Sequence, residues 1–282
     1  MQVTTVDGLR LAVRVDGPVD APVVLCVHGY PDNGSLWDRV RAELAGQYRV
    51  VSFDLRGAGR SEVPQRRRRN YRLDLLAADV VAVGAAVSPA APIHLLAHDW
   101  GSAICWHVVT DPVLAQRFSG FTSISGPCAD HMAHWLRTPR EQKAKWRQLF
   151  RSWYVVFFQL PLLPERRMDR LWMARTRPGP PPEDGDVRNG LLIYRANTLP
   201  RVLRPQQRRT AVPVQVIAPR EDPLVGAAAQ RAGQRFTADL SVRDVPGGHW
   251  LPLENPALIA ETIRESCPPR RCSDSSRLEG RP

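Results

Sequence analysis

The sequence predicts an α/β protein in which helices cover both faces of a mainly parallel sheet of eight strands. Three observations support this fold class. Short apolar runs bounded by turn residues recur along the chain, a stretch with helical spacing separates two of these runs, and a long helical segment interrupts the strand pattern once. Apolar runs that alternate with helices are typical of parallel strands that are buried on both faces.

The strands and one crossover helix can be placed from these patterns. Residues 2–6 and 9–15 flank Asp7-Gly8 and should pair as an opening hairpin. Residues 73–87 should form a crossover helix, because apolar side chains recur there at helical spacing. The other six strands are expected at residues 22–28, 48–54, 92–99, 118–125, 212–218 and 240–245.

The interruption of the strand pattern defines the expected domain organisation. Residues 1–126 and 208–267 should form one α/β core, and residues 127–207 should form a helical lid inserted between two strands. Such a lid would lie over the carboxyl ends of the strands, where open α/β sheets place their sites. Residues 268–282 are polar and rich in Pro, Arg and Ser, so we expect a disordered tail.

The composition is that of an ordinary globular protein, with 43% hydrophobic and 24% charged residues. No apolar run approaches the roughly 20 residues that span a bilayer, and the first residues do not resemble a signal peptide. The five cysteines are scattered and lack the spacing of a metal site, which indicates reduced thiols. We therefore expect a cytoplasmic protein without a stable membrane span, a metal or an organic cofactor.

The formal net charge of +11 raises the question of nucleic-acid binding. Nearly all of the positive charge is arginine, and the densest run, residues 66–69, has only Tyr71 as a neighbouring aromatic residue. Charge alone supports only non-specific association. A solvated basic surface is therefore the preferred interpretation, and no nucleic-acid partner is expected.

Asp99 lies where a strand–turn–helix pattern predicts a reactive side chain. The small residues Ala97 and Gly101 stand two positions before and after it, as in a nucleophile elbow with Asp in place of Ser. Such spacing lets the strand and helix approach closely while the central side chain is exposed on a strained turn. An Asp at this junction is also a common helix cap. The elbow motif alone therefore leaves both interpretations open.

Two further segments favour the nucleophile over the helix cap, because together with the elbow they form a set of three motifs. The three motifs are His28-Gly29-Tyr30-Pro31, Asp54-Leu55-Arg56-Gly57-Ala58-Gly59-Arg60-Ser61 and His98-Asp99-Trp100-Gly101. Together they resemble the motifs of the epoxide hydrolase and haloalkane dehalogenase branch of the α/β-hydrolase superfamily. The resemblance implies the α/β-hydrolase fold, with Asp99 as nucleophile and the backbone N–H groups of Tyr30 and Trp100 as an oxyanion hole.

The expected chain order of nucleophile, acid and histidine is also present. Asp222 follows the strand at residues 212–218, and His249 follows the last strand. By the resemblance these positions carry the acid and the base. Glu221 and Asp130 remain alternative acids, and motif spacing favours Asp222.

An aspartate nucleophile selects a class of substrate. Its carboxylate is ionised without help from a base and suits displacement at a saturated carbon, which gives an alkyl ester. Water activated by His249 and Asp222 would then hydrolyse the ester while the oxyanion hole holds the developing charge. Epoxides and alkyl halides both fit this chemistry.

The lid residues favour an epoxide. An opened epoxide needs a proton donor, and a tyrosine hydroxyl remains protonated at neutral pH. Tyr154 and Tyr194 resemble the two lid tyrosines of the family. A haloalkane dehalogenase is the first alternative, and a non-catalytic ligand-binding protein on the same fold is the second. The expected contacts of the substrate are Trp100, Trp153, Phe158 and Trp250.

These residues imply a lipophilic epoxide and water as the small-molecule partners, and the sequence is compatible with a homodimer. Some chains that are similar to this one between residues 20 and 136 continue into a short-chain dehydrogenase domain. This sequence resembles the hydrolase half of such fusions and contains no Gly-x-Gly-x-x-Gly fingerprint. The sequence therefore indicates no nicotinamide site, and a shortened form of that architecture is left open as one interpretation.

Overall fold

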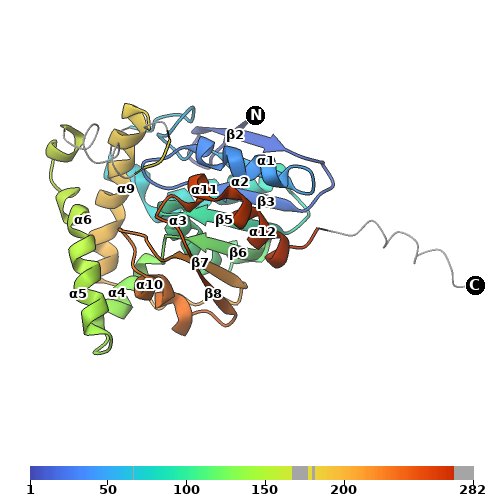
Figure 1. The fold of residues 1–282 in the computed structure, drawn as a ribbon. Coiled ribbons are helices and arrows are strands. Elements are labelled where there is room, and N and C mark those ends of the chain that lie inside the picture. Colours follow the sequence, from blue (N-terminus) through green and yellow to red (C-terminus); the bar gives the residue numbers. More distant parts are fainter. Residues whose placement is uncertain (66, 167–176, 180–181, 270–282) are drawn as a thin grey trace, which may run out of the picture.

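A twisted sheet of eight strands forms the centre of the molecule in the computed structural model, which describes residues 1–65, 67–166, 177–179 and 182–269 (Figure 1). The order across the sheet is β1-β2-β4-β3-β5-β6-β7-β8. β1 and β2 pair antiparallel, as do β2 and β4, and the other neighbours are parallel. The strands are β1 (Gln2–Thr4), β2 (Arg10–Asp16), β3 (Val23–Val27), β4 (Arg49–Phe53), β5 (Ile93–His98), β6 (Phe118–Ile124), β7 (Val214–Pro219) and β8 (Leu240–Val245). The predicted eight-stranded α/β fold is confirmed.

Each face of the sheet has its own apolar core, because successive side chains of a strand point to opposite faces. Within β3, Leu25 and Val27 belong to the core that contains α2 and α3. Val24 and Cys26 belong to the other core, with α1 and α12. The covering helices are α1 (Asp38–Leu44), α2 (Leu73–Val87), α3 (Trp100–Val109), α10 (Ala227–Gln230), α11 (Leu251–Glu254), α12 (Pro256–Ser266) and the 3₁₀ helices η1 (Gly34–Trp37), η2 (Arg68–Tyr71), η3 (Leu114–Arg117) and η4 (Arg231–Arg235).

A group of helices lies between β6 and β7 in chain order and beside the sheet in space (Figure 1). Within this segment, two helices, Gln142–Arg151 and Trp153–Phe157, meet at Ser152. Residues 270–282 of the expected tail lie outside the described residues, and the proposed division into core and lid stays a prediction. The helices of this group are α4 (Ala129–Arg137), α5 (Gln142–Arg151), α6 (Trp153–Phe157) and α9 (Asp184–Leu203).

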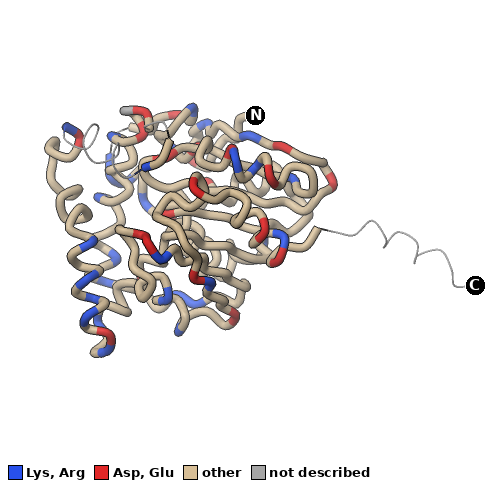
Figure 2. Tube along the Cα trace, viewed as in Figure 1, with Lys and Arg blue, Asp and Glu red and all other residues tan. Residues whose placement is uncertain are grey.

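Basic residues occur on many elements of the chain, both on the sheet side and on the inserted helices (Figure 2). In the described part of the chain, no helix is both long and apolar enough to cross a bilayer.

Four of the predicted site residues follow the carboxyl ends of four parallel strands. Tyr30 comes after β3, Asp99 after β5, Asp222 after β7 and His249 after β8. In a parallel sheet these ends meet at one edge, so loops that are far apart in sequence converge there.

A buried ion pair fixes the loop after β4. Arg56 donates from Nε and Nη2 to the two carboxylate oxygens of Asp79, each at 2.7 Å, and both side chains are inaccessible to solvent. Arg56 also donates to Asp7 and to the carbonyl of Asn70. Burial raises the pKa of Asp79 even with Arg56 beside it. The ionised form of Asp79 is therefore stabilised by Arg56. Arg56 therefore braces the loop after β4 against α2 and the first hairpin.

Replacing Arg56 with Met should lower the free energy of unfolding by about 3–5 kcal/mol, because Asp79 would lose its buried partner. Urea denaturation followed by circular dichroism measures the change. The control is Arg10→Met, which removes a pair with Glu62 that is exposed on both sides and should cost less than about 1 kcal/mol. Equal losses in the two variants would contradict the assignment.

Candidate active site

Asp99 occupies a sharp turn between β5 and α3. Its backbone has φ 52° and ψ −125°, a conformation that residues other than glycine rarely adopt. A Cβ atom added at Gly101 would lie 2.3 Å from the carbonyl oxygen of Val27, and one at Gly126 would lie 2.0 Å from that of Asp99. Small residues are therefore required around the turn.

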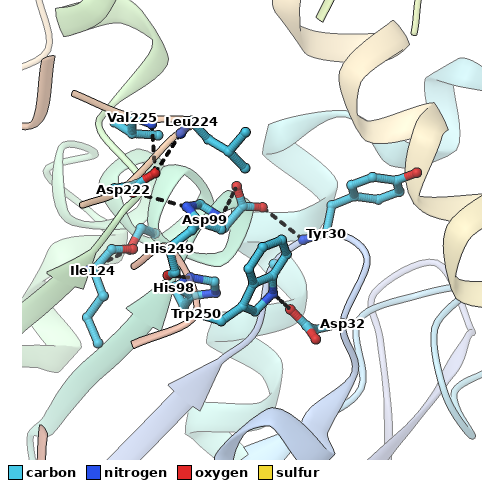
Figure 3. Close-up of polar contacts among 12 residues, drawn as sticks. Tyr30, Asp32, His98, Asp99, Ile124, Asp222, Leu224, Val225, His249 and Trp250 are labelled. Carbon is cyan, nitrogen blue, oxygen red and sulfur yellow. Dashed lines mark hydrogen bonds and ion pairs between the residues drawn. The ribbon is translucent and has the colours of Figure 1, made fainter. Parts of the chain in front are cut away.

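The two carboxylate oxygens of Asp99 face different groups (Figure 3). Oδ1 accepts a hydrogen bond of 2.9 Å from the backbone N–H of Tyr30, and the backbone N–H of Trp100 also bonds this carboxylate. Oδ2 lies 3.8 Å from Nε2 of His249. One oxygen of Asp99 thus faces an amide of the loop after β3, while the other faces the imidazole.

Asp222 orients His249. Its Oδ2 lies 3.0 Å from Nδ1 of His249, and its Oδ1 accepts from the backbone N–H groups of Leu224 and Val225 at 2.8 and 2.9 Å. An imidazole held through Nδ1 directs Nε2 at Asp99.

The two alternative acids lie elsewhere. Asp130 forms ion pairs of 3.1 Å with Arg201 and Arg208, and Glu221 accepts a hydrogen bond from the backbone N–H of Gly247.

The burial of the site sets the protonation of its groups. Burial raises the pKa of Asp99 to about 6, although His249 and the two amides act in the opposite direction. Burial alone would lower the pKa of His249, but Asp222 and then Asp99 raise it to about 9. Burial also opposes ionisation of Asp222, yet its contacts, His249 foremost, hold its pKa below the ordinary value. Near neutral pH the site therefore holds an imidazolium between two carboxylates.

A cavity of about 490 Å³ opens above Asp99. Tyr154 of α6 and Tyr194 of α9 line it together with Asp99 and Trp100, and the rest of its wall is mainly apolar. Side-chain hydrogen bonds join Trp100 to Tyr194 and Tyr194 to Tyr154. Burial raises the pKa of both tyrosines above the ordinary value. Both hydroxyls therefore stay protonated. Tyr194 donates its hydrogen bond to Tyr154, so the hydroxyl of Tyr154 is the one that is able to donate into the cavity.

The four expected substrate contacts lie in different places. Trp100 lines the cavity. Trp153 is 55% exposed on the outer side of α6, because adjacent residues of a helix point about 100° apart and Tyr154 takes the inner side. Phe158 is fully buried behind the tyrosines, with its ring centroid 4.9 Å from that of Tyr194. Trp250 is buried beneath the site, and these last three are not among the described residues of the cavity wall.

His98, which precedes Asp99 and was given no role from the sequence, contacts the loop of His249. Burial lowers its pKa to about 4, so its neutral ring is able to donate from Nε2 to the carbonyl oxygen of His249 at 2.8 Å. The two imidazole rings lie 4.8 Å apart between centroids. Its place next to Asp99 was the only sequence signal.

Asp32 is a second residue that sequence analysis missed. It is buried, accepts a 3.0 Å hydrogen bond from Nε1 of Trp250 and pairs with Arg177 at 2.8 Å. Asp32 therefore links the loop of Tyr30 to the loop of His249. The sequence shows an acidic residue two positions after Tyr30, but it does not show that this residue is buried or that it bonds Trp250, 218 residues away.

No group of three or more His, Cys, Asp or Glu side chains that could hold a metal ion is present in the described parts of the chain.

The chain resembles proteins of known family over most of its length. Residues 22–256 match the family described as alpha/beta hydrolase fold. The chain is 33% identical over 283 residues to the probable oxidoreductase EphD of Mycobacterium tuberculosis, which covers 92% of this chain and 48% of that protein. It is 33% identical over 160 residues to epoxide hydrolase 4 of Mus musculus, which covers 56% and 41%. The chain thus spans about half the length of the curated relatives it matches.

Solved structures agree with this family. An epoxide hydrolase from metagenomes of hot environments has a TM-score of 0.77 and 23% identity, covering 94% of this chain and 97% of that one. A mutant epoxide hydrolase from Bacillus megaterium has a TM-score of 0.78 and 21% identity, covering 94% and 99%. At these identities the likeness shows the fold. With the family match over residues 22–256, it establishes that the chain belongs to the alpha/beta hydrolase fold family.

Proposed function

We propose that this protein is an epoxide hydrolase that converts a lipophilic epoxide to a vicinal diol. The observation that carries the proposal is the composition of one cavity wall. An ionised nucleophile, Asp99, and two proton donors, Tyr154 and Tyr194, line the same largely apolar cavity from three different elements. Opening an epoxide requires both kinds of group at once, because the carbon is attacked while the oxygen takes up charge.

In the first step Oδ2 of Asp99 attacks an epoxide carbon, and the carbon–oxygen bond breaks with its electron pair on oxygen. A tyrosine hydroxyl gives that oxygen a proton. Oδ1 accepts from the amide of Tyr30, the amide of Trp100 also bonds this carboxylate, and Oδ1 becomes the carbonyl oxygen of the ester. The nucleophile is thus fixed before the substrate enters, which lowers the entropic cost of the attack.

Formation of the ester also changes His249. Its pKa is raised by Asp222 and by the charge of Asp99, and the ester is neutral. The pKa of His249 therefore falls, its proton leaves to restore the tyrosine, and Nε2 becomes a base.

Water attacks Cγ of Asp99 and gives one proton to His249. The oxyanion forms on Oδ1 between the two amides, and the departing diol oxygen takes the second proton of that water. Atoms and charges then return to their initial state.

Relatives support this chemistry, since those named epoxide hydrolases align with part of the chain at 31–33% identity. A haloalkane dehalogenase would use the same Asp99, Asp222 and His249, but it needs N–H donors that are free to bind a halide. Here the indole of Trp100 bonds Tyr194. Position 30, where dehalogenases often carry an Asn as a halide donor, is Tyr in this chain. A purely ligand-binding role would require neither the strained turn nor the ordered imidazole.

The variant His249→Gln should accumulate the Asp99 ester, because alkylation needs no base whereas hydrolysis does. Intact-protein mass spectrometry after mixing with styrene oxide should show one added substrate mass, located on the Asp99 peptide. Asp99→Ala is the control and should form no adduct. In wild type, a single turnover in ¹⁸O-water should label Asp99 and leave the diol unlabelled. An unlabelled Asp99 with labelled diol would exclude the ester mechanism.

Replacing both Tyr154 and Tyr194 with Phe should slow alkylation by epoxide by roughly 10²–10⁴-fold, because the leaving oxygen would lose its proton donors. Stopped-flow measurement of the first turnover reports this step. The matched control is Tyr48→Phe, which removes a hydroxyl bonded to the carbonyl of Cys267, outside the cavity. A double variant within a few-fold of wild type would refute the role of the phenols.

The value of kcat/KM should fall on the acid side of about pH 6, by about tenfold per pH unit, because protonated Asp99 is not a nucleophile. In His249→Gln the same limb of the alkylation rate should move to higher pH, since the imidazolium helps to keep Asp99 ionised. A pH-rate profile of both proteins checks this. Retention of the full rate well below pH 5 would contradict it.

A further inference from the structure

Large apolar side chains are exposed along one face of α5 and α6. Trp146 is 62% exposed, Phe150 77% and Val156 72%, and Leu149 and Trp153 are also exposed. These five positions are spaced by three and four residues, so they share one side of the helical path. The opposite side is buried, with Lys145, Gln148, Tyr154 and Phe158. Exposed patches of this kind mark interaction sites. The five residues are called the α5–α6 face below.

All charged residues in the segment that contains the α5–α6 face are basic. Residues 142–163 contain four Lys or Arg and no Asp or Glu, and Figure 2 shows basic residues along α5. Lys143 and Arg147 are exposed beside the apolar side chains. Neither forms an ion pair within the described part of the chain. A helix with Trp and Phe on one side, flanked by Lys and Arg, is typical of segments that lie in a membrane interface.

The cavity of Asp99 opens through this surface. Leu149 and Val156 of the α5–α6 face line the cavity and are exposed, and so are Leu199 and Val202 of α9. These side chains are therefore at the mouth, where the cavity meets the outside. A lipophilic molecule dissolved in a bilayer would reach Asp99 through apolar surface alone if the mouth lay against that bilayer.

We propose that the α5–α6 face binds the surface of an anionic lipid bilayer, with the mouth of the cavity turned toward the lipid. Charge favours this occupant over a second copy of the chain. In a symmetric pair the same patch meets itself, so two patches that both carry Lys143 and Arg147 and no acidic residue would be brought together. Anionic lipid headgroups instead complement both these residues and the net charge of +11. The mode of binding is peripheral, with the apolar side chains inserted at the level of the headgroups.

Sedimentation with vesicles tests the proposal. Wild type should pellet with vesicles of phosphatidylcholine and phosphatidylglycerol, and much less with phosphatidylcholine alone. The double variant Lys143→Glu/Arg147→Glu should bind at least about tenfold more weakly. Its matched control is Arg67→Glu/Arg69→Glu, which makes the same change in net charge at exposed positions in and beside η2 and should retain most of the affinity. Equal losses in the two double variants would overturn the proposal in favour of non-specific attraction.

A second measurement addresses the apolar side chains directly. Bromine-labelled acyl chains should quench the fluorescence of Trp146 and Trp153, and Trp146→Phe/Trp153→Phe should lose that quenching. The variant Trp146→Ser/Phe150→Ser/Trp153→Ser should not bind, whereas Val6→Ser/Val63→Ser/Val113→Ser, at exposed valines elsewhere, should. Absence of vesicle binding by wild type, or a dimer in solution that only the first serine variant dissociates, would overturn the proposal. Neither measurement requires epoxide turnover, so failure of the proposed activity would be seen separately.

Discussion

The left-handed turn at Asp99 is the constraint on which the rest of the site depends. Such a backbone costs about 1–3 kcal/mol at a residue other than glycine, and tight surroundings maintain it. A Cβ atom at Gly29 would lie 2.6 Å from Cβ of Asp99, and Gly101 and Gly126 are equally confined. These glycines form no polar contact with the carboxylate, yet they allow two loops and a helix to meet around it. The amide of Tyr30 is thereby brought within 2.9 Å of Oδ1.

The electrostatics of the site follow from that geometry. The partly exposed Asp99 and the buried His249 and Asp222 lie in a row, and each alters the protonation of its neighbour. An imidazolium between two carboxylates is a poor base, but it keeps the nucleophile ionised. When one carboxylate becomes a neutral ester, the same imidazole is left with one carboxylate and becomes a better base. The order of the two proposed steps therefore follows from the arrangement of these charges.

Sequence was sufficient wherever a local pattern determines structure. The apolar run at residues 22–28 became β3 (Val23–Val27), and the spacing around Asp99 produced the expected turn. It was insufficient wherever distant segments meet. The hydrogen bond from Trp250 to Asp32 and the contact of His98 with the histidine loop join loops more than 150 residues apart. The local sequence shows that α6 is rich in aromatic residues, but it does not show that Trp153 points outward.

Residues of α6 take part in both the proposed epoxide hydrolysis and the proposed binding to a bilayer. Trp153 and Tyr154 are adjacent, and the first is exposed while the second lines the cavity above Asp99. A short helix with both residues cannot shift its outer face without moving its inner hydroxyl. Contact with lipid would therefore act directly on the distance between a proton donor and the nucleophile, and the apolar mouth would deliver substrate to the same point. A hydrolase for lipophilic epoxides gains from this arrangement, because its substrate concentrates in the phase to which the cavity opens.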